Sequence, residues 1–474
     1  MPPTPAWLLA ALALCLLVGV TRVLLLFEHQ PLIALANSYD EVRYTACFDL
    51  YPDRPADVPP TRNSPEAPFA HYRFVPGASP ICYWSSELAF QAATAAIYSM
   101  QETIGAAREH SVRWIGALKL AALLGVWLGL SWALLRRGEH ALALAHGLLL
   151  PLLFADPANA IYLNTFYAEW TALLAAYALC GLIVLGFAQA PTRVLRVLFV
   201  LSAFVLATSK IQHLLLPLAC AGVVLLLEYL RTRSWAWQGK AVLLGAVAGL
   251  ALQCVQLARD SDAIHAIDMF NRSDVAFMGL LPNARDPAAT AAKLGLDPAC
   301  LKFVGMRGWE MSDWPGHACP SLSNLTRGRE LMVLIGEPDL TLRLGWNGVL
   351  ALEPWLAPGL GMVEGGNFDS LPPGFPSFSA VLSASPWLRV LALAAPLISV
   401  PLLLAGWRRR APRLLIFTTL IATIMLASLT VTLLGDGLAD TPKQGHLVLN
   451  AALAWWICIL ALGAARIAGR VRRG

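Results

Sequence analysis

Long apolar runs separated by short polar boundaries make up most of this chain. The runs that can cross a membrane as helices cover residues 6–27, 114–135, 141–155, 171–189, 195–209, 213–230, 241–258, 387–406, 413–434 and 447–465. A spanning helix needs about 20 mainly apolar residues. The third and fifth runs are short, so each either tilts beside a thinned bilayer or ends in a buried break. The pattern predicts an all-α polytopic membrane protein with about ten transmembrane helices.

The amino-acid composition indicates the same class of protein. Of the 474 residues, 57% are hydrophobic and 14% are charged, whereas a soluble domain carries about 25% charged residues. The lipid bilayer is therefore an expected partner. The net charge of +5 reflects the short basic loops between the runs, so it does not indicate a nucleic-acid partner.

Arginine and lysine fall at every second boundary between the runs, and this sets the expected orientation. The basic boundaries are residues 136–137, 193–196, 231–240, 408–413 and 466–473. Short loops rich in these residues stay in the cytoplasm, so both termini are expected inside. The predicted organisation is an N-terminal transmembrane module, 1–258, with a large first outer loop, 28–112, then an extracytoplasmic soluble segment, 259–386, and a C-terminal transmembrane module, 387–474.

A cleaved signal peptide is an alternative interpretation of the first apolar run, because Ala34-Leu35-Ala36 resembles a cleavage site. Signal peptides have an apolar core of about 7–15 residues that follows a basic residue. This run is longer, and no lysine or arginine precedes it. Both features favour a retained helix.

Four of the nine cysteines lie in the two outer segments, as two pairs. Cys47 and Cys82 share the first segment, and Cys300 and Cys319 share the second. An even number in each segment predicts one disulfide apiece in an oxidising compartment. The alternative is four buried free thiols, because cysteine is often a core residue.

The outer segments differ in local pattern. Residues 52–84 are rich in proline and tyrosine and are expected to form an irregular loop. From Ser86, which is a candidate cap, an apolar face at helical spacing predicts a helix that lies along the membrane surface. In the second segment, residues 287–296 and 325–334 predict short helices and 354–376 a loop. That segment is expected to be a small lid over a site in the membrane module.

Four polar clusters interrupt the apolar chain, and all four are expected on the outer side. The first contains Asp40 and Glu41, about a dozen residues after the first run. A carboxylate at the headgroup level can act as a general base toward a substrate that is half lipid. The alternative is two solvated loop acids beside Arg43.

The second cluster covers residues 156–169. Asp156 precedes Pro157 and is expected to stop one helix or cap the next. Asn164, Tyr167 and Glu169 form a polar edge with aromatic neighbours, which suits sugar hydroxyls. An aromatic belt at the membrane boundary also explains the tyrosines, but it does not explain Glu169.

The third and fourth clusters add cations. Lys210 and Gln212 lie between two apolar runs, and a lysine binds phosphate as a point charge. The alternative is a lysine that extends to the boundary at a helix end. The fourth cluster is a glycine-rich turn that contains two acids and two basic residues, Asp436, Asp440, Lys443 and His446.

In their order and spacing, these clusters resemble the GT-C superfamily of membrane glycosyltransferases, and more narrowly the bacterial hexose transferases of surface-glycan biosynthesis. The similar motifs are Ser85-Ser86-Glu87, Asn164-Thr165-Phe166-Tyr167-Ala168-Glu169, Ser209-Lys210 and Gly435-Asp436-Gly437 with Ala439-Asp440, Lys443 and His446. One departure is the inserted Gln444-Gly445 before His446. Superfamily members use a sugar linked to polyprenyl phosphate and place an acidic catalytic residue in the first outer loop.

The resemblance implies a role for the first cluster, and the residue types suggest roles for the others. Carried over, the superfamily's acidic catalytic residue would be Asp40, with Glu41 as the alternative. As a hypothesis from the residues themselves, Lys210, Arg43, Lys443 and His446 would bind the donor phosphate. The residues left to bind the sugar and the acceptor are Asp156, Asn164, Tyr167, Glu169, Gln212, Asp436 and Asp440.

The implied activity is transfer of a hexose from a polyprenyl-phosphate donor to a surface glycan or lipid-linked acceptor. The site would face the outside of a bacterial inner membrane. Alternatives are a glycan polymerase or ligase, which would transfer a whole chain, and a transporter of a lipid-linked glycan. No cofactor follows from the sequence, no metal site is predicted, and the need for a divalent cation is left open.

Overall fold

The computed structural model describes residues 4–34, 38–53, 69–77, 82–187, 192–235, 237–352, 362–363, 374–405 and 412–471. Within these ranges, eight helices are long and apolar enough to cross a membrane. They contain or correspond to α1 (Ala6–Phe27), α4 (Arg113–Arg136), α7 (Glu169–Gly186), α9 (Leu216–Thr232), α10 (Trp237–Arg259), α18 (Pro386–Ala405), α19 (Pro412–Asp436) and α21 (His446–Val471). The protein is therefore an all-α polytopic membrane protein, as predicted.

The two short apolar runs are also helical. The third is α5 (His140–Gly147), which continues into a π-helical turn, η2 (Leu150–Phe154), and the fifth is α8 (Arg193–Ser209). Of the two alternatives given for the short runs, the break holds for the third run, because the chain turns after η2 into the short helix α6 (Pro157–Ala160). The prediction of about ten spans thus corresponds to eight full-length helices and two shorter ones in the described part of the chain.

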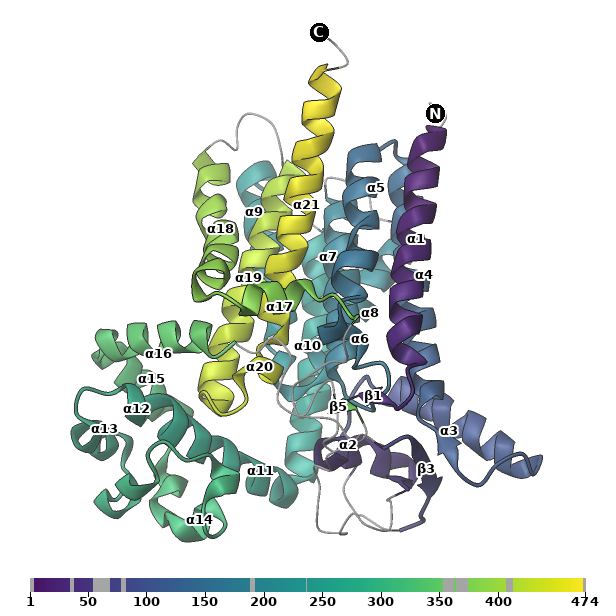
Figure 1. The fold of residues 1–474 in the computed structure, drawn as a ribbon. Helices are drawn as coiled ribbons and strands as arrows, with labels where there is room; N and C mark the ends of the chain where they lie inside the picture. The colour runs from purple at the N-terminus through teal and green to yellow at the C-terminus, as the bar shows by residue number, and fades with distance from the viewer. Residues whose placement is uncertain are drawn as a thin grey trace.

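The two chain termini lie at the same end of the helical bundle, and both outer segments gather at the opposite end (Figure 1). This arrangement agrees with the even number of crossings expected from the basic boundaries. Which end faces the cytoplasm stays a prediction from the positive-inside rule.

Close helix packing fixes the position of α8 against α10. A Cβ added at Gly249 would collide with the Ala207 side chain, and one added at Gly245 would collide with the Val200 carbonyl. Small residues at such crossings let helix backbones approach closely. The end of α8, at Ser209, is therefore held firmly beside α10.

The first outer segment contains a small sheet that the sequence did not predict. Three antiparallel strands, β2 (Leu50–Pro52), β3 (His71–Phe74) and β4 (His110–Ser111), pair in that order. Residues 52–84 are thus not wholly irregular, and the strands were too short to give an alternating pattern. Most of the proline-rich stretch lies outside the described residues. The Cys47–Cys82 disulfide is present in this segment.

The helix expected after Ser86 is α3 (Leu88–Thr103), which projects to one side of the bundle (Figure 1). The expected cap was wrong. The Ser86 hydroxyl instead donates to the carbonyl of Val205 in α8 (2.8 Å), and no side chain caps α3. A tertiary contact has replaced the local one.

The second outer segment is helical and has its own apolar core. Its helices are α11 (Ser261–Asp274), α12 (Leu281–Asn283), α13 (Pro287–Leu294), α14 (Pro315–Ala318), α15 (Arg327–Gly336) and α16 (Pro338–Leu350), with a π-helical turn, η4 (Val275–Leu280). The structure contains the helices expected at 287–296 and 325–334, and Thr326 caps the latter. Cys300 and Cys319 are joined by a disulfide. Most of the loop expected at 354–376 lies outside the described residues.

A short sheet links the two outer segments, and a buried cap links the second of them to the membrane bundle. Strand β1 (Ile33–Ala34) pairs with β5 (Met362–Val363). Asp156 caps α6 and also accepts hydrogen bonds at the start of α17 (Phe378–Ser383), from the Phe378 amide (2.7 Å) among others. Asp156 therefore ties the membrane bundle to the end of the second segment.

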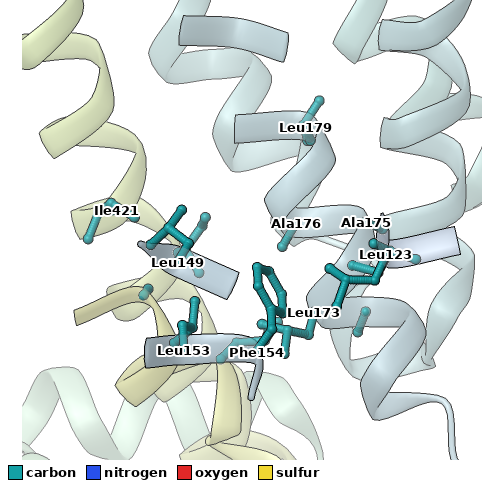
Figure 2. Close-up of a cluster of buried hydrophobic side chains, with 14 of the residues drawn as sticks. Leu123, Leu149, Leu153, Phe154, Leu173, Ala175, Ala176, Leu179 and Ile421 are labelled. Carbon is teal, nitrogen blue, oxygen red and sulfur yellow. The ribbon is translucent and has the colours of Figure 1, made fainter. Parts of the chain in front are cut away.

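A buried ion pair supports the loop between α6 and α7. Lys119 of α4 contacts Glu87 (2.8 Å), and both side chains are fully buried. The Lys119 ammonium also donates to the carbonyls of Thr165 (2.8 Å) and Tyr167 (3.1 Å). The surrounding core is apolar and joins α4, η2, α7 and α19 (Figure 2). In this setting, a charge is stable only with its partners.

Replacement of Lys119 by methionine is expected to destabilise the protein by about 3–5 kcal/mol, because it leaves Glu87 buried without its cation. Thermal unfolding of the purified protein in detergent measures this loss. The double variant Lys119→Met/Glu87→Met should recover much of the stability. As a control, Glu28→Gln, which breaks the solvent-exposed pair with Arg113, should cost less than about 1 kcal/mol. Equal effects of the two single variants would contradict this role for Lys119.

Candidate functional site

Asp40 lies on α2 (Ser38–Thr45), the short helix that follows α1 and β1. Its carboxylate contacts the Lys443 ammonium and the Arg43 guanidinium (3.1 Å). Lys443 belongs to α20 (Thr441–Gln444) and also lies 3.7 Å from Asp440. The first and fourth polar clusters of the sequence therefore meet through alternating charges.

Lys210 brings in the second and third clusters. It ends α8 in an extended conformation (φ −154°, ψ 148°), and a turn, η3 (Ile211–His213), follows. Its ammonium contacts the Glu169 carboxylate (2.8 Å) and the side-chain oxygen of Gln444 (2.9 Å). Gln444 is one of the two residues, Gln444 and Gly445, that are inserted before His446 relative to the expected motif. The insertion thus supplies a contact to Lys210.

A cavity of about 80 Å³ opens between these charges. Its walls include the predicted residues Asp40, Arg43, Tyr167, Glu169, Lys210 and Gln212. They also include residues that were not predicted as site residues, namely Tyr44, Tyr83, Ile211, Ile267, Asn271 and Gln444. Ile267 and Asn271 come from α11, so the second outer segment contributes to the wall. Tyr83 lies in the aromatic stretch before α3. That aromatic composition was the one sequence feature that could have indicated Tyr83 as a site residue.

The charges of the cavity are strongly coupled. Burial alone disfavours an ionised Asp40, but Lys443, Arg43 and Lys210 outweigh it and hold the pKa of this carboxyl well below its usual range. Burial also disfavours the charge of Lys443, yet Asp40, Asp440 and Glu169 hold the pKa of Lys443 above its usual value. Asp40 is therefore ionised and Lys443 is protonated at neutral pH.

A second polar layer lies beneath the cavity. His446 faces the backbone carbonyl of Glu169 (3.2 Å), and its ring lies 6.2 Å from that of His213. His213 in turn contacts the Ser209 hydroxyl (3.1 Å). His446 does not line the cavity. Its position favours a role in holding Glu169 over direct contact with a phosphate.

Asp436 and Asp440 bound the turn after α19. Asp436 ends that helix and is nearly buried, and burial raises the pKa of Asp440. Between them, Gly437 adopts φ +60°, and a Cβ there would meet the Asp274 carbonyl and the Gly279 amide. Only glycine fits this turn. Within the described ranges, no group of three or more histidine, cysteine or acidic side chains is arranged to hold a metal ion.

Seven predicted site residues do not line the cavity. Four of them, Asp436, Asp440, Lys443 and His446, lie in the segment 436–446, and the other three are held by contacts elsewhere. Glu41 accepts hydrogen bonds from the Tyr72 hydroxyl (2.7 Å) and the Phe166 amide (3.0 Å) and is buried. Asn164 is buried and donates to the carbonyl of Phe27 (3.1 Å). The third is Asp156, the buried cap described above. These contacts favour structural roles for all three.

These features define a class of protein: a multi-pass membrane protein with a charged cavity at the end opposite its termini. The chain matches the family model described as the YfdI N-terminal transmembrane domain over residues 8–315, nearly two thirds of its length, and it belongs to that family. The matched range includes Asp40, Glu169 and Lys210 but ends before Lys443. No curated protein and no solved structure matches the chain.

The buried Glu41 generates a pH-dependent prediction. Burial raises the pKa of Glu41 from 4.5 to about 7. The two hydrogen bonds that the carboxylate accepts lower the pKa, but their effect is smaller than that of burial. The contribution of Glu41 to stability is therefore complete below about pH 4.5 and is lost as the pH rises through about 7. The loss is at most about 3 kcal/mol, since one pKa unit corresponds to about 1.4 kcal/mol.

Glu41→Gln mimics the protonated form and should remove this loss. Relative to wild type, the variant is expected to gain thermal stability at pH 8 and to match it at pH 4.5. Unfolding scans of both proteins across this range measure the difference. A difference that does not change with pH would mean that folding does not raise the pKa of Glu41.

Proposed function

We propose that this protein transfers a hexose from a polyprenyl-phosphate donor to a glycan or lipid-linked acceptor at the outer face of a bacterial inner membrane. One observation carries the proposal: Asp40 and Lys210 line the same cavity at one end of the membrane bundle. This provides a base and a phosphate-binding cation within the reach of one sugar. The family match supports a glycosyltransferase-like membrane protein in general terms.

Lys210 and Arg43 line the cavity and would bind the donor phosphate, together with Lys443, which contacts Asp40 from outside the lining. Lys210, Lys443 and Arg43 are matched by Glu169, Asp440 and Asp40, so the cavity is close to neutral before the donor binds. An anionic phosphate would compete with Asp40 for Lys443 and Arg43. As these cations turn toward the phosphate, Asp40 loses the interactions that hold its pKa low and becomes a stronger base.

The proposed reaction is a single displacement. The acceptor oxygen bonds to the anomeric carbon while its proton passes to the Asp40 carboxylate. The bond from the anomeric carbon to the phosphate oxygen breaks, and its electron pair stays on the lipid phosphate. Lys210 stabilises the charge that develops there. The sugar is transferred with inversion.

The remaining walls suit a single sugar. Tyr44 and Tyr83 offer aromatic surfaces, and their rings pack edge to face at 5.9 Å. Glu169, Tyr167 and Gln212 offer polar groups for hydroxyls. A cavity of about 80 Å³ favours a donor that carries one sugar over the long chain that a polymerase or ligase would transfer. The charges lie at one membrane boundary, whereas transporters usually place them at the midplane.

Asp40→Asn is expected to reduce transfer by about 10²-fold or more, because it removes the base. The rate of sugar transfer from a polyprenyl-phosphate hexose, measured with folded protein, tests this. Asp53→Asn is the matched control, since Asp53 forms a surface pair with Arg73 (3.5 Å) in the same outer segment. It should stay within about twofold of wild type. A fully active Asp40→Asn protein would remove Asp40 from the mechanism.

The ion pair to Lys443 predicts a change in the pH–rate profile. In the free wild-type enzyme the low pKa of Asp40 keeps the base ionised in mildly acidic solution, so no acid limb is expected above about pH 4 in the profile of kcat/KM, which reports the free enzyme. Lys443→Gln removes a cation, raises the pKa of Asp40 and should shift the acid limb to higher pH. Lys443→Arg keeps the charge and should keep the wild-type profile. Superimposable profiles for wild type and Lys443→Gln would show that the two groups are not coupled.

A further inference from the structure

A second, larger cavity of about 680 Å³ runs through the membrane part of the protein. Its walls come from α5 and η2, α7, α19 and α21, with the end of α4. Part of the wall is visible in Figure 2, which shows Leu149, Leu153, Phe154, Leu173, Ala176 and Ile421. The lining is almost wholly apolar, so the cavity suits a hydrocarbon chain.

This apolar cavity is distinct from the charged one. No described residue lines both. On α21, its lining starts at Leu447 and continues at helical spacing through Ala454 to Arg466. At 1.5 Å per residue this face is about 28 Å long, close to the hydrocarbon thickness of a bilayer, about 30 Å.

The few polar groups in the middle of this wall already have partners. His146 contacts the Ser131 hydroxyl (3.1 Å) and the Tyr177 hydroxyl. Asn450 exchanges hydrogen bonds with Asn159 (2.7 and 2.9 Å). Because these groups are satisfied, the middle of the cavity offers nothing for a polar ligand to bind.

Charged residues appear where the cavity reaches the end of the bundle that carries the termini. Arg413, at the start of α19, forms an ion pair with Glu139. Arg466 is exposed, and no described residue forms an ion pair with it. The rim thus carries two arginines and one glutamate, which leaves an excess of positive charge beside an apolar groove.

We propose that this cavity binds an anionic phospholipid from the leaflet on the side of the termini. The hydrocarbon chain would occupy the apolar cavity, and the phosphate would contact Arg466 and Arg413. Basic pockets between transmembrane helices bind anionic headgroups in this way. A neutral lipid gains nothing from the arginines, and the charged rim lies at the end opposite the sugar-transfer site. The inference does not depend on the proposed transferase activity.

The test is lipid retention by the purified full-length protein, measured by native mass spectrometry after incubation with phosphatidylglycerol or phosphatidylcholine. Wild type should retain phosphatidylglycerol preferentially. Arg466→Gln should weaken retention about fivefold, the factor that corresponds to about 1 kcal/mol per basic residue. Glu139→Gln removes the competing carboxylate and should strengthen it. A general loss of folding cannot produce effects of opposite sign.

Two further variants test whether retention needs the apolar cavity and whether it depends on the position of the arginine. Ala454→Phe fills the cavity and should abolish retention of phosphatidylglycerol. Arg196→Gln changes an exposed arginine at the same end of the bundle, at the start of α8 and outside the cavity lining, and should leave retention unchanged. Asp40→Asn should also retain the lipid. Lipid binding can therefore be tested independently of the proposed transferase activity.

Equal retention of both lipids, or retention by Arg466→Gln equal to that of wild type, would overturn the proposal. Displacement of phosphatidylglycerol by a polyprenyl phosphate at equal concentration would also overturn it, because the cavity would then belong to the donor.

Discussion

The contact between Asp40 and Lys443 joins residues 403 positions apart, and the charged cavity is organised around it. A carboxylate at the edge of an apolar bundle is costly to ionise unless a cation compensates it. The same requirement applies to Glu169 with Lys210 and to Glu87 with Lys119. Each pair joins separate elements, so the need for compensation holds together parts of the chain that are remote in sequence.

The apolar runs predicted the membrane helices well, because a spanning helix needs a length and composition that can be read from sequence. The charges within them were harder to interpret. Lys119 lies inside the run 114–135, and its partner Glu87 lies in a different segment. The two residues come together only in the folded protein, beside the loop between α6 and α7, so no local sequence pattern reveals this ion pair. The strands β2, β3 and β4 were missed because they are two to four residues long.

The sequence alone could not decide which of the adjacent acids Asp40 and Glu41 belongs to the site. On a helix their side chains point about 100° apart, so the two acids could serve different roles. Only the fold reveals that Glu41 faces Tyr72 on β3 while Asp40 faces the cavity. Gln444 illustrates the converse, since a departure from the expected motif supplies a direct contact to Lys210.

The connection between α10 and α11 consists of one residue, Asp260. Ile267 and Asn271, which form part of the cavity wall, therefore follow a membrane-spanning helix almost without interruption. Helices adjust their tilt when the thickness of the surrounding bilayer changes. Through this short joint, a change in the tilt of α10 would move the two residues that α11 contributes to the wall of the charged cavity.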